Sequence, residues 1–243
     1  METFKLVYKP LGSIALLIEW PQEINTSILW NISLFREEIH IQLPDRVLET
    51  VPAYCSLTVF FDTKKIKYSS VVKRIKEIYK SLPNEKEMVS NIWKIPVCYD
   101  IDFGIDLKEL CKEKKLSQEK FIDLHSKSLY DVYFIGFLPG FLYLGGLNSK
   151  LSQKRKAKPR LKIEKGAVGI AGDQTGIYPR ESPGGWNIIG NSPINFFDVE
   201  KDPPCFAKSG DKVQFIPIDR EQYYQISEQV EKGTYKIEFE SYG

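Results

Sequence analysis

Residues 169–190 read GIAGDQTGIYPRESPGGWNIIG and are the most glycine-rich part of the chain. Seven of the sixteen glycines lie between Gly166 and Gly190, and eleven lie between Gly136 and Gly190. Glycine is used where φ must be positive or where the backbone approaches another group closely. Short apolar runs separated by such glycine- and proline-rich turns continue from residue 130 onward. This pattern predicts a β-rich domain, built as a barrel.

Upstream of that domain, the chain shows a readable order of elements. Strands are expected at 13–20, 46–51, 56–61 and 92–99, and helices at 24–39 and 69–82, where apolar residues recur at helical spacing. The order βαββαβ is that of the ferredoxin-like fold. The sequence therefore predicts an α+β protein, with a ferredoxin-like domain over residues 1–88 and a β-barrel domain over residues 89–243.

Three further helices are expected within the second domain. Two charged pieces lie in 99–128, where Asp106 with Glu109 forms a potential capping box and Ser117 caps the second piece. Asp219 opens a late helix over 219–230.

Composition excludes several classes of protein. The net charge of +2 and the absence of a nucleic-acid reading motif argue against a nucleic-acid partner. The longest apolar stretch, IALLI, is too short to span a bilayer, and no signal-peptide layout opens the chain. The four cysteines are scattered, with no partnered histidines, which predicts reduced thiols, no metal site and a cytoplasmic location.

Familiar catalytic motifs are absent from the sequence. Neither glycine cluster has the Walker A spacing, and no G-x-G-x-x-G follows a strand. The chain has two histidines, His40 and His125, and no G-x-S-x-G elbow accompanies them. A P-loop and a serine triad are therefore excluded.

The glycine clusters at 136–146 and 169–190 allow two interpretations. They form either the walls of a pocket, with backbone N–H donors and aromatic side chains, or tight barrel turns with aromatic residues in the core. Arg160 suits a carboxylate or phosphate, because its planar fork binds both oxygens. Gln174 and Tyr178 suit an amide or carbonyl group. The other basic residues of 154–158 are expected to form a solvated loop.

The ordered motifs identify a resemblance. The segments GFLPGFLYLGGL (136–147), GAVGIAGDQTGIYPRESPGGWNIIGNSP (166–193) and GDKVQFIPI (210–218) closely resemble the allophanate hydrolase subunit 1 family. The likeness continues through VPAYCSLTVFFD and IPVCYDIDFGIDLKEL and covers nearly the whole chain. The family includes the B subunit of ATP-dependent 5-oxoprolinase and an inhibitor of sporulation kinase A. It implies that the C-terminal barrel is cyclophilin-like.

The resemblance implies one subunit of a larger enzyme. Its partners would be an allophanate hydrolase subunit 2-type protein and a third 5-oxoprolinase subunit, and ATP would be shared with a partner. The substrate would be a small lactam or amide, with 5-oxo-L-proline cleaved to L-glutamate. Two alternatives stay open: a component of a urea carboxylase or allophanate hydrolase pathway, and a binding module that inhibits a sensor histidine kinase.

The resemblance also implies a site. Its expected catalytic residues are His125 and Gln174, and its expected substrate-binding residues are Arg160, Tyr178, Phe137, Pro139, Gly140, Gly172 and Glu181. No metal is expected. Asp173 and Arg180 depart from the family pattern, and we expect these two charges to form an ion pair with each other.

Overall fold

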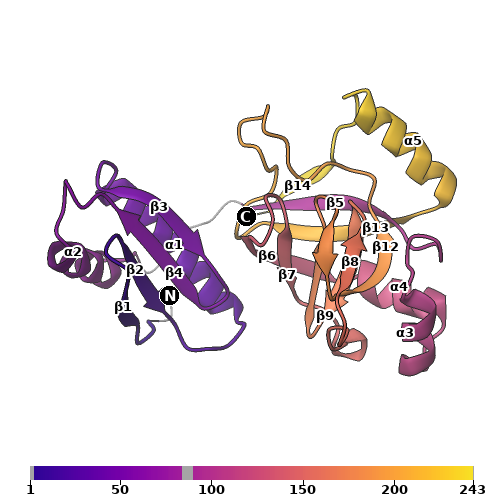
Figure 1. Ribbon diagram of the computed structural model, residues 1–243, viewed down its shortest axis with the longest axis horizontal. Coiled ribbons are helices and arrows are strands. Elements are labelled where there is room, and N and C mark those ends of the chain that lie inside the picture. The colour runs from indigo at the N-terminus through magenta and orange to yellow at the C-terminus, as the bar shows by residue number, and fades with distance from the viewer. Residues whose placement is uncertain (1–2, 84–89, 243) are drawn as a thin grey trace. The chain divides into compact units, whose positions relative to one another are not determined.

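The computed structural model describes residues 3–83 and 90–242, which form two compact units, Met1–Met88 and Val89–Gly243 (Figure 1). The boundary predicted at residue 88 lies outside the described residues. Each unit has its own sheet and its own apolar core.

The N-terminal unit is a four-stranded antiparallel sheet with two helices on one face. Its elements are β1 (Val7–Leu11), β2 (Ala15–Glu19), α1 (Thr26–Gln42), β3 (Val47–Pro52), β4 (Ser56–Phe61) and α2 (Tyr68–Lys80). The strand order is β1-β2-β4-β3. Inward residues of β2 and β4, such as Ile18 and Val59, pack against α1 and α2 residues such as Phe35 and Ile75, and all four are fully buried.

The predicted βαββαβ order of this unit is wrong at one strand. The segment expected at 92–99 lies in the barrel, where β5 (Ser90–Cys98) pairs in parallel with β13 (Lys212–Ile218). The edge place beside β2 is taken instead by β1, through a hairpin whose turn contains Gly12 at φ +60°. The order is therefore ββαββα. Pro10 and the mixed polarity of β1 hide this strand from a pattern search.

The second unit is a β-barrel, as predicted. Its further strands are β6 (Leu129–Ile135), β7 (Leu142–Gly145), β9 (Ala167–Ala171), β10 (Gln174–Ile177), β12 (Asn187–Asn191) and β14 (Phe239–Tyr242). The strand order is β12-β9-β10-β7-β6-β13-β5-β14, and a pairing between β12 and β5 closes the barrel. The fold class predicted above, an α+β sheet domain followed by a β-barrel domain, is confirmed.

Smaller elements surround the barrel. They are α3 (Leu107–Lys114), α4 (Gln118–Ser126), α5 (Arg220–Glu231), a short 3-10 helix at Ser149–Leu151, and a separate two-stranded sheet of β8 (Arg160–Ile163) with β11 (Ser182–Gly184). The predicted caps Ser117 and Asp219 are confirmed, because each side chain accepts a backbone N–H of the first turn. The predicted capping box at Asp106 is wrong, because its side chain makes no cap hydrogen bond. Within the described residues, no helix has the length and apolar character needed to cross a bilayer.

Candidate functional site

The barrel wall formed by β7, β9 and β10 is packed on both faces. Side chains alternate along a strand, so Thr175 and Ile177 of β10 point inward, while Gln174 and Gly176 belong to the opposite, outer face. Gly176 lies opposite Tyr143 of β7 and Gly169 of β9. The glycine clusters at 136–146 and 169–190 meet on the outer face of this wall.

Glycine is required at position 176 because aromatic rings lie directly on its backbone. A Cβ atom there would come within 3.0 Å of the Trp186 ring and 3.1 Å of the Phe141 ring. These distances are tighter than ordinary van der Waals contact, so a side chain at 176 would displace the rings. The glycine that the sequence shows inside this strand therefore serves a close packing contact.

An aromatic cluster forms the floor of the outer face. The Phe141 ring meets Tyr178 at 5.3 Å and Trp186 at 5.5 Å, both nearly perpendicular, and Tyr143 at 4.8 Å. Edge-to-face pairs of this kind are favourable because the positive edge of one ring meets the negative face of another. Phe141, Tyr178 and Trp186 are buried, whereas Tyr143 is half-buried and stacks on the Phe134 ring at 4.3 Å.

Two arginines lie beside this floor. The Arg155 guanidinium lies 5.9 Å from the centre of the Trp186 ring, within cation–π range. Burial raises the pKa of Tyr178 to about 12, although a hydrogen bond from the Trp186 backbone and the charges of Arg155 and Arg160 act in the opposite direction. The Tyr178 hydroxyl is therefore neutral at physiological pH, and the positive charges of Arg155 and Arg160 act on it.

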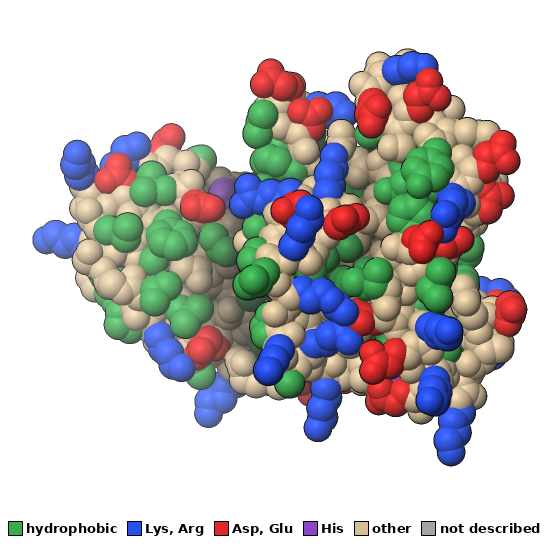
Figure 2. Space-filling model, turned by 45° about the vertical axis from the view of Figure 1, so that its right-hand side comes forward, with side chains coloured by type: hydrophobic (Ala, Val, Ile, Leu, Met, Phe, Trp, Pro, Cys, Tyr) green, Lys and Arg blue, Asp and Glu red, His purple; other side chains and the backbone are tan. Residues whose placement is uncertain are grey.

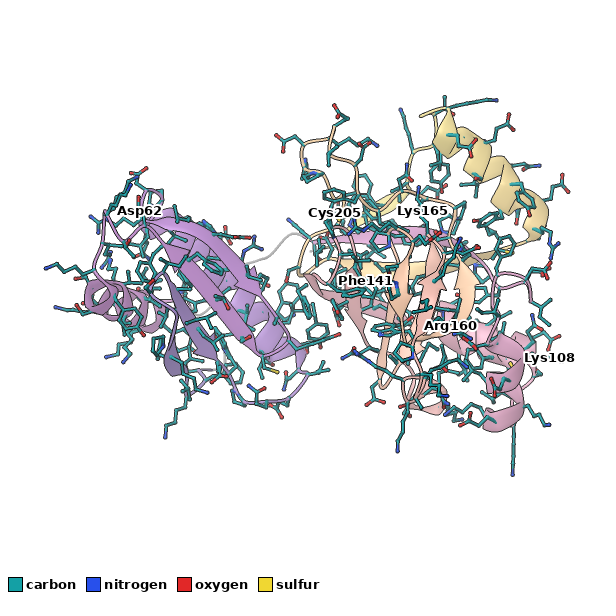
Figure 3. All side chains as sticks on the ribbon, in the orientation of Figure 1. Asp62, Lys108, Phe141, Arg160, Lys165 and Cys205 are labelled. Atoms are coloured by element: carbon teal, nitrogen blue, oxygen red, sulfur yellow. The ribbon has the colours of Figure 1, made fainter. Side chains whose placement is uncertain are left out.

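Arg160 is held by a buried carboxylate that the sequence analysis had assigned to a helix cap. Asp106 is 2 % exposed and accepts both terminal nitrogens of Arg160, at 2.9 and 2.7 Å. Asp106 also accepts hydrogen bonds from Lys156 Nζ at 2.8 Å and from the Ile188 backbone N–H at 2.7 Å. Arg160 is labelled in Figure 3. Burial alone raises the pKa of Asp106, but these three donors outweigh it and hold the pKa below its usual value.

This arrangement leaves a surplus of positive charge. Two carboxylates, Asp106 and Glu109, balance the two cations Lys156 and Arg160, because Glu109 lies 3.6 Å from Lys156 Nζ. Arg155 is then the cation in surplus beside the aromatic floor. The expectation that the basic residues of 154–158 form a solvated loop is therefore wrong for Lys156, whose side chain is only 26 % exposed. An anion is the chemically suitable ligand for such a surface.

His125 lies on the other side of the wall, in the barrel core. Its ring is fully buried, with Nδ1 2.7 Å from the Tyr99 hydroxyl and Nε2 3.0 Å from Thr175 Oγ1. Thr175 Oγ1 donates to Gly169 O at 3.0 Å, so it accepts a hydrogen bond from Nε2–H. Nδ1 then accepts from Tyr99. Burial lowers the pKa of His125 from about 6.5 to about 3, so the ring is neutral.

The remaining predicted residues lie at different places around the outer face. Phe137, at φ +64° and 62 % exposed, contacts Phe141 at 5.6 Å, Pro139 is exposed, and Gly140 is buried against Phe196. Gly172, in the β9–β10 turn, exchanges backbone hydrogen bonds with Gln153. Gln174 is half-buried on the outer face. The structure thus brings Gln174, Tyr178, Phe137 and Arg160 to one side of the barrel wall and places His125 on the other.

The expected ion pair between Asp173 and Arg180 is wrong. Both side chains are exposed, and neither makes an ion pair in the part of the chain that the structure describes. Glu181 instead pairs with Lys162 at 2.9 Å, with both side chains about 60 % exposed. Asp173 precedes strand β10 and Arg180 follows it, so the length of the strand separates the two charges.

The residues that the sequence analysis missed are Asp106, Lys156, Arg155 and Tyr143. Asp106 and Arg160 are far apart in sequence, and no spacing rule joins them. Tyr143 and Arg155 carried a weaker signal, since one lies in the first glycine cluster and the other in the basic segment before Arg160. Among the described residues, no group of histidine, cysteine or acidic side chains could hold a metal ion.

Comparison with known proteins places this geometry in a family. Residues 6–207 match the family of the carboxyltransferase domain, subdomain C and D. The chain is 36% identical to the B subunit of the 5-oxoprolinase of Bacillus subtilis (strain 168), over 93% of this chain and 99% of that protein. The chain therefore belongs to the carboxyltransferase C and D subdomain family, together with the 5-oxoprolinase B subunits.

Solved structures share this fold. The crystal structure of TTHA0988 is 33% identical with a TM-score of 0.75, covering 84% of this chain and 40% of that chain, so the present chain spans less than half of that longer protein. The Kluyveromyces lactis urea amidolyase has a TM-score of 0.84 over 99% of this chain and 16% of its own. At 19% identity, the latter shows a shared fold.

Proposed function

We propose that the chain is the lactam-binding subunit of an ATP-dependent 5-oxoprolinase, which cleaves 5-oxo-L-proline to L-glutamate with its partner subunits in the cytoplasm. The names of its relatives support this proposal. The observation that carries it is the exposed Arg155 guanidinium beside the aromatic floor, because 5-oxoproline is a small anion with an apolar ring.

The substrate would lie on an outer-face site, defined as Gln174, Tyr143, Arg155 and Phe137. The Arg155 guanidinium is exposed and suits the substrate carboxylate, whereas Arg160 is already paired with Asp106. The half-buried ring of Tyr143 offers an apolar surface for the lactam ring. The Gln174 amide carries both a donor and an acceptor, which match the carbonyl and N–H of a lactam.

The other expected site residues take supporting roles in this proposal. Tyr178 is 1 % exposed and supports the floor under the lactam, and Arg160 keeps the Asp106 cluster in place. Gly172 and Pro139 belong to the exposed rim, Gly140 is buried beneath it, and Glu181 is engaged with Lys162. His125 becomes a positioning residue: it fixes Thr175, the neighbour of Gln174 on β10, without reaching the substrate.

ATP supplies the driving force for lactam opening, because phosphorylation of the amide oxygen makes the carbonyl carbon a better electrophile for water. The sequence contains no Walker A loop, and the cations Lys156 and Arg160 are engaged with Asp106. We therefore assign the nucleotide to a partner subunit, either the subunit 2-type protein or the third subunit. This chain would contribute the binding and orientation of the lactam.

Reconstitution tests the proposal. The chain, a subunit 2-type partner and the third subunit are co-expressed, and glutamate release from 5-oxoproline is measured with and without ATP. We expect ATP-dependent release from the full set and none from this chain alone. Arg155→Ala should raise the KM for 5-oxoproline by roughly tenfold, the value of about one charge-assisted hydrogen bond. Arg180→Ala is the matched control, since Arg180 is also exposed in this unit. Absence of glutamate from every combination would contradict the proposal.

A further inference from the structure

A cavity lies in the barrel unit, and its buried residues Ile163, Ala167 and Ile188 belong to the same apolar cluster as Phe141, Tyr178 and Trp186. Its volume is about 240 Å³, the space of roughly eight water molecules. Three segments form it: the turn before α3, the β8–β9 connection, and β12. Because these segments are far apart in the sequence, the cavity exists only in the folded barrel.

The lining combines an apolar floor with charged groups. Ile163, Ala167 and Ile188 are each 3 % exposed and form the floor, while Phe103 and Ile105 form one wall. Phe103 is backed by the ring of Tyr223 on α5, at 4.4 Å between ring centres. An apolar body with a ring or a short alkyl chain fits a cavity of this composition.

The charges around the cavity are mostly negative. Asp102 and Glu164 line it together with Lys162, and Lys162 pairs with Glu181 at 2.9 Å. Asp102 pairs with Arg220, which also binds Asp100 at 2.7 Å and lies over the Phe103 ring at 6.0 Å. In this group, four carboxylates face two cations.

Glu164 is the carboxylate left for a ligand. Glu164 is exposed. Its charge adds to that of Glu181 in raising the pKa of Lys162, and it adds to the effect of burial in raising the pKa of Tyr223. Its charge therefore acts on both sides of the cavity. The other polar lining group, Asn191, is already satisfied: it donates to Lys165 O at 2.9 Å and accepts from the Tyr223 hydroxyl at 3.0 Å. A carboxylate next to an aromatic ring is a suitable environment for an organic cation.

We propose that this cavity binds a small amphipathic amine, with the ammonium group on Glu164 beside Phe103 and the apolar body on Ile163, Ala167 and Ile188. Figure 2 shows hydrophobic side chains on the surface of the barrel unit bordered by acidic and basic ones. The Arg220 side chain, which already lies over Phe103, is an internal example of the same recognition. The proposal does not depend on the function proposed above.

Titration calorimetry with four probes tests the proposal: n-hexylamine, 2-phenylethylamine, 1-hexanol and hexanoate. We expect saturable binding of both amines at about tenfold higher affinity than hexanol, the effect of one charge-assisted contact, and no measurable binding of hexanoate. Equal affinities for hexylamine and hexanoate, or no binding of either amine, would overturn the proposal.

Variants locate the binding. Glu164→Gln should weaken hexylamine by about tenfold and leave hexanol unchanged, because it removes the charge and keeps the shape. Glu200→Gln, an exposed glutamate away from the cavity lining, is the matched control. Ile105→Trp, at a wall residue that is 56 % exposed, should fill the cavity and abolish binding of both probes. Retained amine affinity in Glu164→Gln would refute the assignment of the ammonium group.

Discussion

The two faces of strand β10 use adjacent residues for opposite purposes. Thr175 faces the buried interior, where it bonds His125 Nε2 and where Tyr99 bonds His125 Nδ1. Gln174 faces an outer surface with aromatic rings and surplus positive charge. A single strand can therefore separate stability from binding at a spacing of one residue, so changes on the two faces should have different effects.

The largest expected effect is on the inner face. His125→Ala should lower the free energy of unfolding by about 4 kcal/mol, because it leaves a ring-sized cavity beside Phe215 and removes the partners of Tyr99 and Thr175. Urea denaturation followed by tryptophan fluorescence measures this change. His40→Ala, at the other histidine, which is exposed, is the control and should change stability by less than about 1 kcal/mol. Equal effects of the two substitutions would show that His125 contributes no more to stability than an exposed histidine.

The pH dependence of stability is the next largest effect. The pKa of His125 is about 3 in the folded chain and about 6.5 when unfolded. Between these two pH values the unfolded state binds a proton that the folded state does not bind. The contribution is therefore fully present above pH 6.5 and is lost as the pH falls toward 3, at ~1.4 kcal/mol per pH unit. The difference in unfolding free energy between the wild type and His125→Ala, measured from pH 7 to pH 4, should shrink accordingly. A difference independent of pH would contradict a neutral buried ring.

A smaller effect is expected at the cluster that anchors the outer face. Asp106→Asn should lower stability by about 2 kcal/mol, because Arg160 and Lys156 lose their charged partner while remaining partly exposed to water. Thermal unfolding gives the measurement. Asp198→Asn, which removes a surface ion pair with Lys201, should have little effect. Equally small losses of stability in both variants would show that the Asp106 cluster contributes no more to stability than a surface ion pair.

The smallest stability effect is expected at Gln174. Gln174→Ala should change the free energy of unfolding by less than about 0.5 kcal/mol, yet lower glutamate release by the reconstituted enzyme at least roughly tenfold. Gln225→Ala on α5 is the matched control for both measurements. A stability loss comparable to that of His125→Ala, or unchanged turnover, would remove Gln174 from the site.

Local patterns in the sequence predicted much of the architecture. The glycine-rich turns indicated the barrel, and Ser117 and Asp219 marked the starts of two helices, because caps and turns depend on residues close together in the chain. The exchange of β1 for β5 at the edge of the N-terminal sheet was not predictable in this way. It depends on the pairing of β5 with β13, more than a hundred residues away.

The candidate site was predicted in part for the same reason. Gln174 and Tyr178 stood out as polar groups among glycines, and the structure places both on one face. Asp106 could not be found, since its partner Arg160 is 54 residues distant and its position near a helix start invited a local explanation. His125 carried no signal that distinguishes a buried imidazole from an exposed one.

The hairpin of β1 and β2 has a consequence for the chain as a whole. Because β1 fills the edge place, the N-terminal sheet is complete before residue 84, and none of the described strands of one unit pairs with a strand of the other. Each unit thus has its own set of sheet hydrogen bonds and its own apolar interior. Recombination could therefore move one unit without breaking a sheet hydrogen bond among the described strands of the other.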